Sequence, residues 1–196
     1  MTKLKNSVVK SILLAGVGGQ GILRASDIIS MALMESGFDV KKSEVHGMAQ
    51  RGGCVTSFVR YGEKVFSPLA WEGSVDIMLS FEKLETLRYL DFMKRTGKVV
   101  IGEEEIFPPD VNLGISEYPH NVPDIVRKYF RSVKVVNISS LASKAGNPRT
   151  ANTIMIGVLS RYLPVKPHVW EEIIKTSFPA KLIQVNINAF NIGSIA

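Results

Sequence analysis

The residues best suited to chemistry fall in two glycine-rich segments in the first third of the 196-residue chain. The first reads Gly16-Val17-Gly18-Gly19-Gln20-Gly21 and lies between an aliphatic stretch and apolar residues at helical spacing. Glycines at such a turn let the backbone approach a ligand closely, and free amides at the start of a helix attract phosphate. The segment predicts an anion or phosphate site, with a turn that only packs a strand against a helix as the alternative. The candidate residues are Gly16, Gly18, Gly19, Gln20 and Gly21.

The second segment runs from Glu44 to Gly53 and combines polar donors with three glycines. It follows a predicted strand, so it should lie beside the first segment at the sheet edge where open α/β folds bind ligands. The planar guanidinium of Arg51 suits phosphate or carboxylate. His46 is expected to hydrogen-bond the loop rather than to transfer protons. The candidates are His46, Gln50, Arg51, Gly52 and Gly53.

The sequence offers few residues that could bind a metal ion or an iron-sulfur cluster. Cys54 is the only cysteine, whereas an iron-sulfur cluster usually takes about four thiolates. The three histidines, His46, His120 and His168, match no metal-binding spacing. No metal ligands and no catalytic residues are predicted, and any redox centre must belong to another chain. Cys54 itself is expected to be a buried, inert thiol.

The charge balance favours an anionic ligand or partner. The chain carries 24 Lys and Arg against 18 Asp and Glu, a formal net charge of +6. These basic residues are spread out and are not interleaved with aromatic residues, which argues against nucleic acid. No apolar run reaches the roughly 18 residues that cross a bilayer, and the amino-terminal residues lack the pattern of a secretion signal. We therefore expect a cytoplasmic protein without a membrane partner.

The periodicity predicts an α/β fold: a Rossmann-like open, mostly parallel sheet with an inserted β-hairpin and a helical C-terminal segment. One domain is expected over residues 1–196, with a β-α-β core in 1–139, the hairpin near 54–67 and helices in 140–196. The expected strands include 8–15, 39–45, 55–60, 64–66, 75–81, 98–101 and 133–138. The expected helices include 22–33, 82–94, 122–130, 147–163, 169–175 and 180–190.

Four stretches of the chain are similar to sequence motifs of one family: Gly16–Leu23, Glu44–Gly53, Phe81–Leu90 and Asn152–Gly157. They resemble the gamma-type subunit of the 2-oxoacid:ferredoxin oxidoreductases. The likeness spans most of the chain in register. The amino-acid sequence from His46 to Gly53 resembles the indolepyruvate branch of that family most.

The resemblance implies a share in the oxidative decarboxylation of a 2-oxoacid, an aryl pyruvate such as indolepyruvate, to an acyl-CoA, with electrons passed to ferredoxin. Thiamine diphosphate, Mg and iron-sulfur clusters would be held by a large partner subunit with a ferredoxin-like domain. Coenzyme A is the co-substrate that this chain would contact, through the two glycine-rich segments and Asn152. The chain alone would be inactive and could form a homodimer.

Three alternatives stay open. The chain could be the gamma subunit of an enzyme for pyruvate or another 2-oxoacid. It could also be a stand-alone nucleotide-binding dehydrogenase, in which Glu44 at the end of the second strand would bind ribose hydroxyls. A non-catalytic nucleotide-binding regulatory module is the third reading.

Overall fold

The computed structural model describes residues 8–47 and 53–196, together with the backbone but not the side chain of His46. This part of the chain forms a six-stranded sheet in the order β2-β3-β1-β4-β5-β6. The strands are β1 Lys10–Val17, β2 Asp39–His46, β3 Cys54–Gly62, β4 Val75–Glu82, β5 Met93–Glu104 and β6 Ser132–Val136. The pairs β1/β4, β4/β5 and β5/β6 are parallel, whereas β3 runs antiparallel to both β1 and β2. The expected mostly parallel α/β sheet is therefore confirmed.

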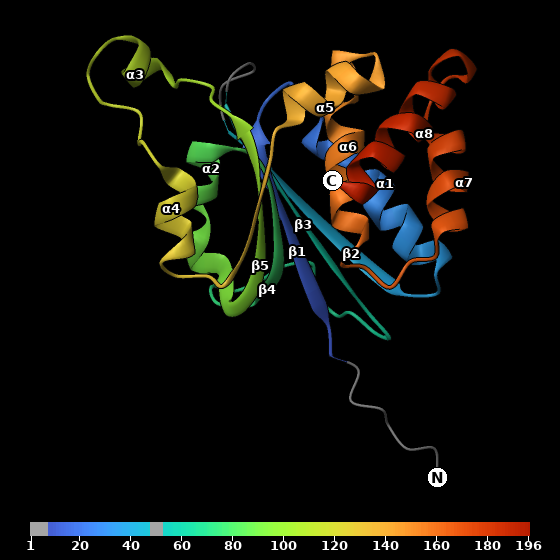
Figure 1. The fold of residues 1–196 in the computed structure, drawn as a ribbon. Helices are drawn as coiled ribbons and strands as arrows, with labels where there is room; N and C mark the ends of the chain where they lie inside the picture. Colours follow the sequence, from blue (N-terminus) through green and yellow to red (C-terminus); the bar gives the residue numbers. More distant parts are fainter. Residues whose placement is uncertain (1–7, 48–52) are drawn as a thin grey trace.

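Helices cover both faces of this sheet (Figure 1). One face carries α1 Ile22–Glu35 and the C-terminal helices α5 Ile138–Ala145, α6 Ala151–Ser160, α7 Pro167–Ser177 and α8 Ala180–Ile195. The other face carries the short helices α2 Lys83–Arg88 and α4 Val122–Arg127, with α3 Pro109–Asn112 in the long connection before α4. Each face of the sheet has its own hydrophobic core beneath these helices. The side chains of Leu13 and Leu14 in β1 are fully buried and pack into one core each, as expected for a central strand.

The β-hairpin expected near 54–67 is wrong, because the two strands that pair as an antiparallel hairpin are β2 and β3. Asp39 lies opposite Gly62 and His46 opposite Val55, and the expected arm 64–66 is not a strand. Side chains hold this segment in place of a ladder: the Val65 amide donates to the Asp39 carboxylate at 2.8 Å. The Arg60 guanidinium donates to the carbonyls of Ser67 and Leu69. A sequence pattern cannot show that a main-chain group is satisfied by a distant side chain.

The expected helix over 82–94 is also shorter than its pattern suggested. α2 ends at Arg88, a 3-10 turn spans Leu90–Phe92, and β5 already begins at Met93. Glu85 and Thr86 are its buried residues, whereas Leu84, Leu87 and Leu90, whose helical spacing predicts the longer helix, are only half-buried. The Thr86 hydroxyl and the Glu85 amide both donate to Glu82, which turns this side of the helix toward the sheet.

The helical C-terminal segment is confirmed and joins the larger core. α6 lies almost entirely inside, with all residues from Asn152 to Leu159 buried. It approaches α8 so closely that a Cβ added at Gly157 would collide with the Phe190 carbonyl, and one at Gly193 with the Ile154 carbonyl. Glycine is required at both positions because backbone meets backbone there.

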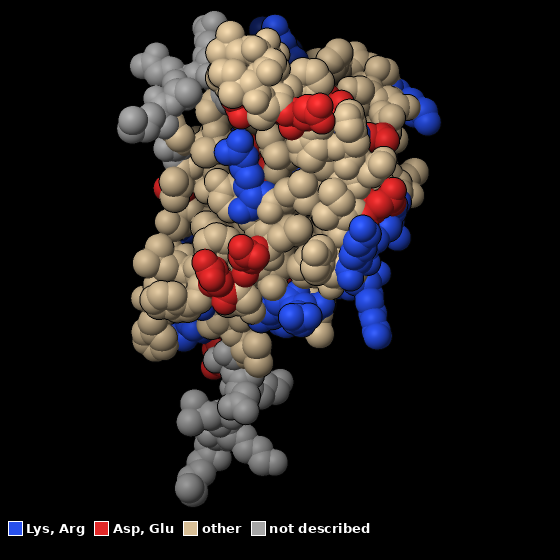
Figure 2. All heavy atoms as spheres, turned by 90° about the vertical axis from the view of Figure 1, so that its left-hand side faces the viewer, with Lys and Arg blue, Asp and Glu red and all other residues tan. Residues whose placement is uncertain are grey.

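The surface over α2, α3 and α4 is mostly uncharged, with acidic and basic side chains interspersed (Figure 2). A nucleic-acid surface would present clustered cations instead. Within the described residues, no helix is both long and apolar enough to cross a membrane.

Candidate functional site

The first glycine segment forms a loop, Gly18–Gly21, between β1 and α1. This glycine loop lies where the chain connections leave the sheet toward opposite faces. From β1 the chain passes into α1 on one face of the sheet, and from the neighbouring β4 it passes into α2 on the other face. Ligands of open α/β sheets bind at such a switch point, beyond the carboxyl ends of the strands. The loop turns there on Gly19 and Gly21, whose φ angles of 105° and 80° are conformations that other residues rarely adopt.

Gln20 braces the loop rather than facing outward with free polar groups. Its side-chain oxygen accepts from the Val17 amide at 2.8 Å, and its side-chain nitrogen donates to the Phe81 carbonyl at 3.1 Å. The first contact closes the turn, and the second ties it to the end of β4. The loop is therefore held in shape before any ligand binds.

The second glycine segment reaches the first one, as the sequence predicted. The Gly18 amide donates to the Gly53 carbonyl at 2.9 Å, and Val17 pairs with Cys54 where β3 begins. Gln50, Arg51 and Gly52 lie outside the described residues, as does the side chain of His46.

The start of α1 is electropositive. Gly21 precedes the helix, none of the side chains that the structure describes caps its first amides, and no acidic residue occupies its first turn. Arg24 adds a full positive charge to that turn, and its guanidinium lies 5.1 Å from the ring centre of Phe178. Free amides and the helix dipole attract anions, so this end of α1 suits a phosphate or carboxylate group.

Asn152 supports the loop from α6. A Cβ built on Gly21 would lie 2.9 Å from its Nδ2, so the asparagine side chain rests against the glycine backbone. Its Oδ1 accepts from the Thr153 amide, and Thr153 in turn donates to Asn186 of α8. A position on a buried helix thus fixes one wall of the loop.

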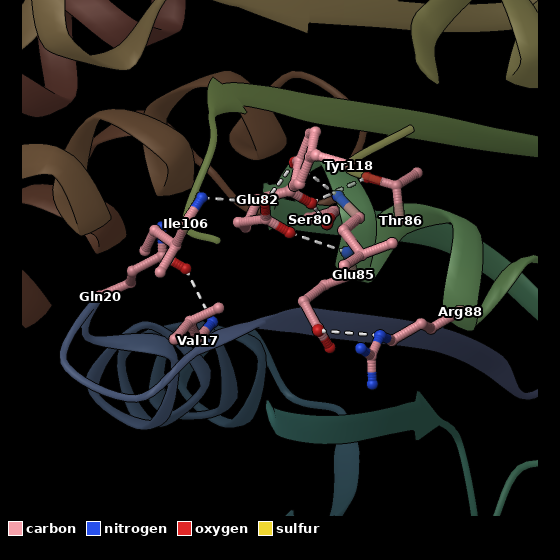
Figure 3. A network of polar contacts seen from close by, with 10 residues as sticks. Val17, Gln20, Ser80, Glu82, Glu85, Thr86, Arg88, Ile106 and Tyr118 are labelled. Carbon is pink, nitrogen blue, oxygen red and sulfur yellow. Dashed lines mark hydrogen bonds and ion pairs between the residues drawn. The ribbon is translucent and has the colours of Figure 1, made fainter. Parts of the chain in front are cut away.

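A buried carboxylate at the end of β4 is the main feature that sequence reasoning missed (Figure 3). Glu82 is fully buried, and its side chain accepts from the amides of Glu85 and Ile106 and from the Tyr118 hydroxyl. Ile106 and Tyr118 lie near the two ends of the connection between β5 and α4. Glu82 therefore pins both ends of that connection beside the glycine loop.

Glu85, one turn after Glu82, is also buried, but fewer partners offset the loss of water around its carboxylate. Its side chain lies 3.3 Å from the Arg88 guanidinium through one oxygen, while the other oxygen has no partner within the described residues. Burial raises the pKa of Glu85 to about 7, the nearby Arg88 opposes this rise, and Glu82 adds to it. Burial and the hydrogen bond to Glu82 also raise the pKa of Tyr118, which keeps its hydroxyl a donor.

A cleft of about 390 Å³ opens next to the loop. Gln20, Phe81 and Ile106 line it, together with Ile138 and Ser139 at the start of α5. The Ser139 hydroxyl donates to the Glu104 carboxylate at 2.6 Å. A mainly apolar lining with a few polar groups is typical of a site for an organic ligand.

The dehydrogenase alternative fits this geometry poorly. β3 lies between β1 and β2, so Glu44 is two strand spacings from the glycine loop instead of one. Glu44 also pairs with Lys42 at 2.7 Å. The acid that would bind ribose hydroxyls is thus misplaced.

No group of three or more His, Cys, Asp and Glu side chains that could hold a metal ion occurs in the part of the chain that the structure describes. Cys54 is half-buried rather than fully buried. Because the sequence holds no other cysteine, this chain alone cannot supply the thiolates of an iron-sulfur cluster.

Comparison with known proteins decides the family. Residues 11–195 match the family model described as pyruvate ferredoxin/flavodoxin oxidoreductase. The chain belongs to this family. It is 39% identical over 188 residues to indolepyruvate oxidoreductase subunit IorB of Thermococcus kodakarensis and 38% identical over 187 residues to that of Archaeoglobus fulgidus. These alignments cover 93% of this chain, and 93% and 92% of the two relatives.

Solved structures from this family share the fold. The gamma subunit of a keto/oxoacid ferredoxin oxidoreductase from Geobacter sulfurreducens matches with a TM-score of 0.68 and 21% identity, over 94% of this chain and 95% of its own. A 2-oxoglutarate:ferredoxin oxidoreductase from Magnetococcus marinus, solved with coenzyme A and succinyl-CoA bound, matches with a TM-score of 0.72 and 21% identity. That match covers 95% of this chain but only 30% of the longer one.

Proposed function

We propose that this chain is the small, gamma-type subunit of an indolepyruvate ferredoxin oxidoreductase, the subunit that its IorB relatives represent. Four relatives named IorB are 35–39% identical to it, whereas the subunits of 2-oxoglutarate and pyruvate/ketoisovalerate enzymes are 25–27% identical. This difference supports an aryl 2-oxoacid as the substrate.

The complete reaction needs a larger partner. We infer that the partner subunit holds thiamine diphosphate, Mg and the iron-sulfur clusters and passes electrons to ferredoxin. Thiamine diphosphate supplies the stabilisation of negative charge that decarboxylation of a 2-oxoacid requires. The single cysteine and the lack of a metal-binding group in the described residues support this division of labour.

The role of this chain is to bind coenzyme A at the switch point. The observation that carries this role is the start of α1 after the glycine loop, which has no acidic residue in its first turn and no cap from the described side chains. A phosphate of coenzyme A would accept from the loop and helix amides, with Arg51 as a further cation. Gln20 and Asn152 hold the loop in shape, and Glu82 fixes the adjoining connection.

The residues in contact with coenzyme A would be those of the two glycine segments, with Gln20 and Asn152 as supports of the loop rather than contacts. Asn152 and Gln20 act through the loop, because their described polar contacts are within the protein. This arrangement orients the co-substrate and covers the partner's reaction centre. We also expect a weak homodimer when the partner is absent.

Reconstitution tests the subunit role. The purified chain alone is expected to show no indolepyruvate-dependent, coenzyme A-dependent dye reduction, and activity should return with the large thiamine-diphosphate subunit. Indolepyruvate should be used with a higher kcat/KM than pyruvate or 2-oxoglutarate. Robust turnover by the lone chain would contradict the subunit role, and a preference for pyruvate would favour the gamma subunit of a pyruvate enzyme. Tight NADH binding by the lone chain would support the dehydrogenase.

A further inference from the structure

The connection between β5 and α4, residues 105–121, projects from the protein as an arm that includes α3 (Figure 1). This α3 arm leaves the sheet at the carboxyl end of β5. Leu113 and Ile115 on the arm are 74% and 75% exposed, and Ile106 and Phe107 near its start are 38% and 48% exposed. Large apolar side chains gathered on one exposed connection are typical of surfaces that bind other proteins. The α3 arm is therefore a candidate docking surface.

Hydrogen bonds within the α3 arm give it a defined conformation. The Asn112 side-chain amide donates to the Phe107 carbonyl at 2.9 Å, and the Ser116 hydroxyl donates to the Asp110 carboxylate at 2.8 Å. Glu82 holds the two ends of the arm from inside the protein (Figure 3). A loop that is ordered before binding loses little conformational entropy when a partner covers it. The arm thus presents its exposed apolar side chains in a form that favours association.

The charge of this part of the chain is opposite to that of the whole. No Lys or Arg occurs between Lys98 and Arg127, whereas the chain as a whole carries a formal net charge of +6. The acidic residues in this interval are Glu103, Glu104, Glu105, Asp110, Glu117 and Asp124. Glu105 pairs with Lys83, whereas Glu103 and Glu117 are exposed. Complementary charges steer association, so the surface that covers the arm is expected to be rich in Lys and Arg.

The α3 arm begins at the cleft beside the glycine loop. Ile106 and Glu104 line that cleft together with Gln20. In the proposed function, coenzyme A binds at this end of the sheet, while the thiamine diphosphate that reacts with the 2-oxoacid belongs to the partner subunit. The two can react only if the partner approaches this end of the sheet, and the arm projects from the same end. A second copy of this chain brings no such cofactor.

We propose that the α3 arm is a docking surface for the large, thiamine-diphosphate-binding subunit. Leu113 and Ile115 insert into an apolar pocket of that subunit, and Glu103 and Glu117 face Lys and Arg side chains at the rim of the pocket. This inference rests on the proposed function. It adds the surface through which this chain meets its partner and the chemistry of the partner surface that covers it.

Binding of the full chain to the purified large subunit tests the apolar part of the surface. Leu113→Ser combined with Ile115→Ser should weaken the affinity by roughly tenfold or more, while the melting temperature stays within a few degrees because both side chains are exposed. Phe66→Ser combined with Trp71→Ser is the matched control. These exposed side chains lie at the sheet end opposite the glycine loop, so the affinity should stay within about twofold of wild type.

The same assay tests the charges of the arm. Glu103→Gln combined with Glu117→Gln should weaken binding and make it less sensitive to salt. Glu63→Gln combined with Glu72→Gln, at two exposed acids away from the arm, should change neither property. When the large subunit is saturated with the Leu113→Ser and Ile115→Ser variant, the KM for coenzyme A should equal that of wild type, because the arm binds the partner and not the co-substrate.

The proposal is overturned if the wild-type chain binds the large subunit and the Leu113→Ser and Ile115→Ser variant binds it equally well. It is also overturned if this variant loses self-association but keeps its affinity for the large subunit, because the arm then contacts a second copy of the chain. An unchanged affinity and salt dependence for the Glu103→Gln and Glu117→Gln variant would overturn the cationic rim. If the wild-type chain neither binds nor activates the large subunit, the proposed function itself is wrong.

Discussion

Glu82 and Glu85 show how position in a fold changes the chemistry of identical side chains. Three donors contact Glu82, whereas Glu85 has one buried oxygen without a partner in the described part of the chain. A charged carboxylate in the first environment is well compensated, and in the second it is not. The ionisation of Glu85 is therefore coupled to folding near neutral pH.

Glu85→Gln is expected to stabilise the protein at pH 8 and to change little at pH 5. Because the pKa of Glu85 is raised to about 7, the folded protein binds more protons than the unfolded chain between about pH 4.5 and 7. The contribution of Glu85 to stability thus falls as the pH rises through this range. Glutamine keeps the shape without the charge, so the gain at pH 8 should be on the order of 1–3 kcal/mol.

Urea unfolding of both proteins at pH 5 and pH 8 measures this effect. Asp124→Asn is the control, since Asp124 is an exposed carboxylate paired with Arg127 at 2.8 Å. Surface pairs of this kind contribute little. Equal effects of Glu85→Gln at the two pH values would show that its carboxyl group is not buried as described.

The two glutamates also mark what the sequence could not show. The glycine loop was predictable because the end of the strand, the glycines and the start of the helix follow one another directly along the chain. Glu82 and Glu85 stand in a stretch with the charge pattern of a solvated helix, and the partners of Glu82, Ile106 and Tyr118, come from a distant connection. Only the folded chain brings these groups together.

At the scale of elements, the packing of the C-terminal helices depends on a close approach between the backbones of two of them. α6 and α8 meet at Gly157 and Gly193, where an added Cβ would collide with main-chain atoms of the facing helix. The helices were predictable from periodicity. The hairpin arms were not, because β3 inserts between β1 and β2 and the segment around Val65 is held by Asp39.

Gly157→Ala is expected to destabilise the protein, although alanine in a helix normally gains about 1 kcal/mol over glycine. The added methyl group must push α8 away, and overpacking of this kind costs about 1–3 kcal/mol. Thermal unfolding should therefore show a lower melting temperature. Asn188→Ala, on the exposed side of α8, is the control and should be neutral or slightly stabilising. A higher melting temperature for Gly157→Ala would contradict the close contact.

At the scale of the whole molecule, the apolar surface is concentrated in two connections. One, after β3, exposes Phe66, Leu69 and Trp71, and the other, around α3, exposes Leu113 and Ile115. β1 pairs with β3 along its whole length, which places the first group at the sheet end opposite the glycine loop. Exposed large apolar groups of this kind mark surfaces that contact other proteins.

The isolated chain is expected to self-associate weakly through the first group. Sedimentation should show the average mass rising with concentration, and Phe66→Ser combined with Trp71→Ser should hold the chain monomeric. The matched pair Leu113→Ser and Ile115→Ser tests whether the second group contributes. A strict monomer at high concentration that also fails to bind the large subunit would count against a subunit role.

The most direct test of the account is the coenzyme A dependence of the reconstituted enzyme with indolepyruvate saturating. Arg51→Ala should remove a charge-assisted contact of about 1.5–3 kcal/mol, which raises the KM for coenzyme A by roughly tenfold to a hundredfold. Gly18→Val should be worse, because a branched side chain would obstruct the approach of a phosphate to the backbone of the loop, where the Gly18 amide contacts Gly53. Arg131→Ala should leave the KM unchanged. If a folded Gly18→Val and Arg51→Ala both keep the wild-type coenzyme A dependence, the glycine loop is a packing turn and the proposed role of this chain is wrong.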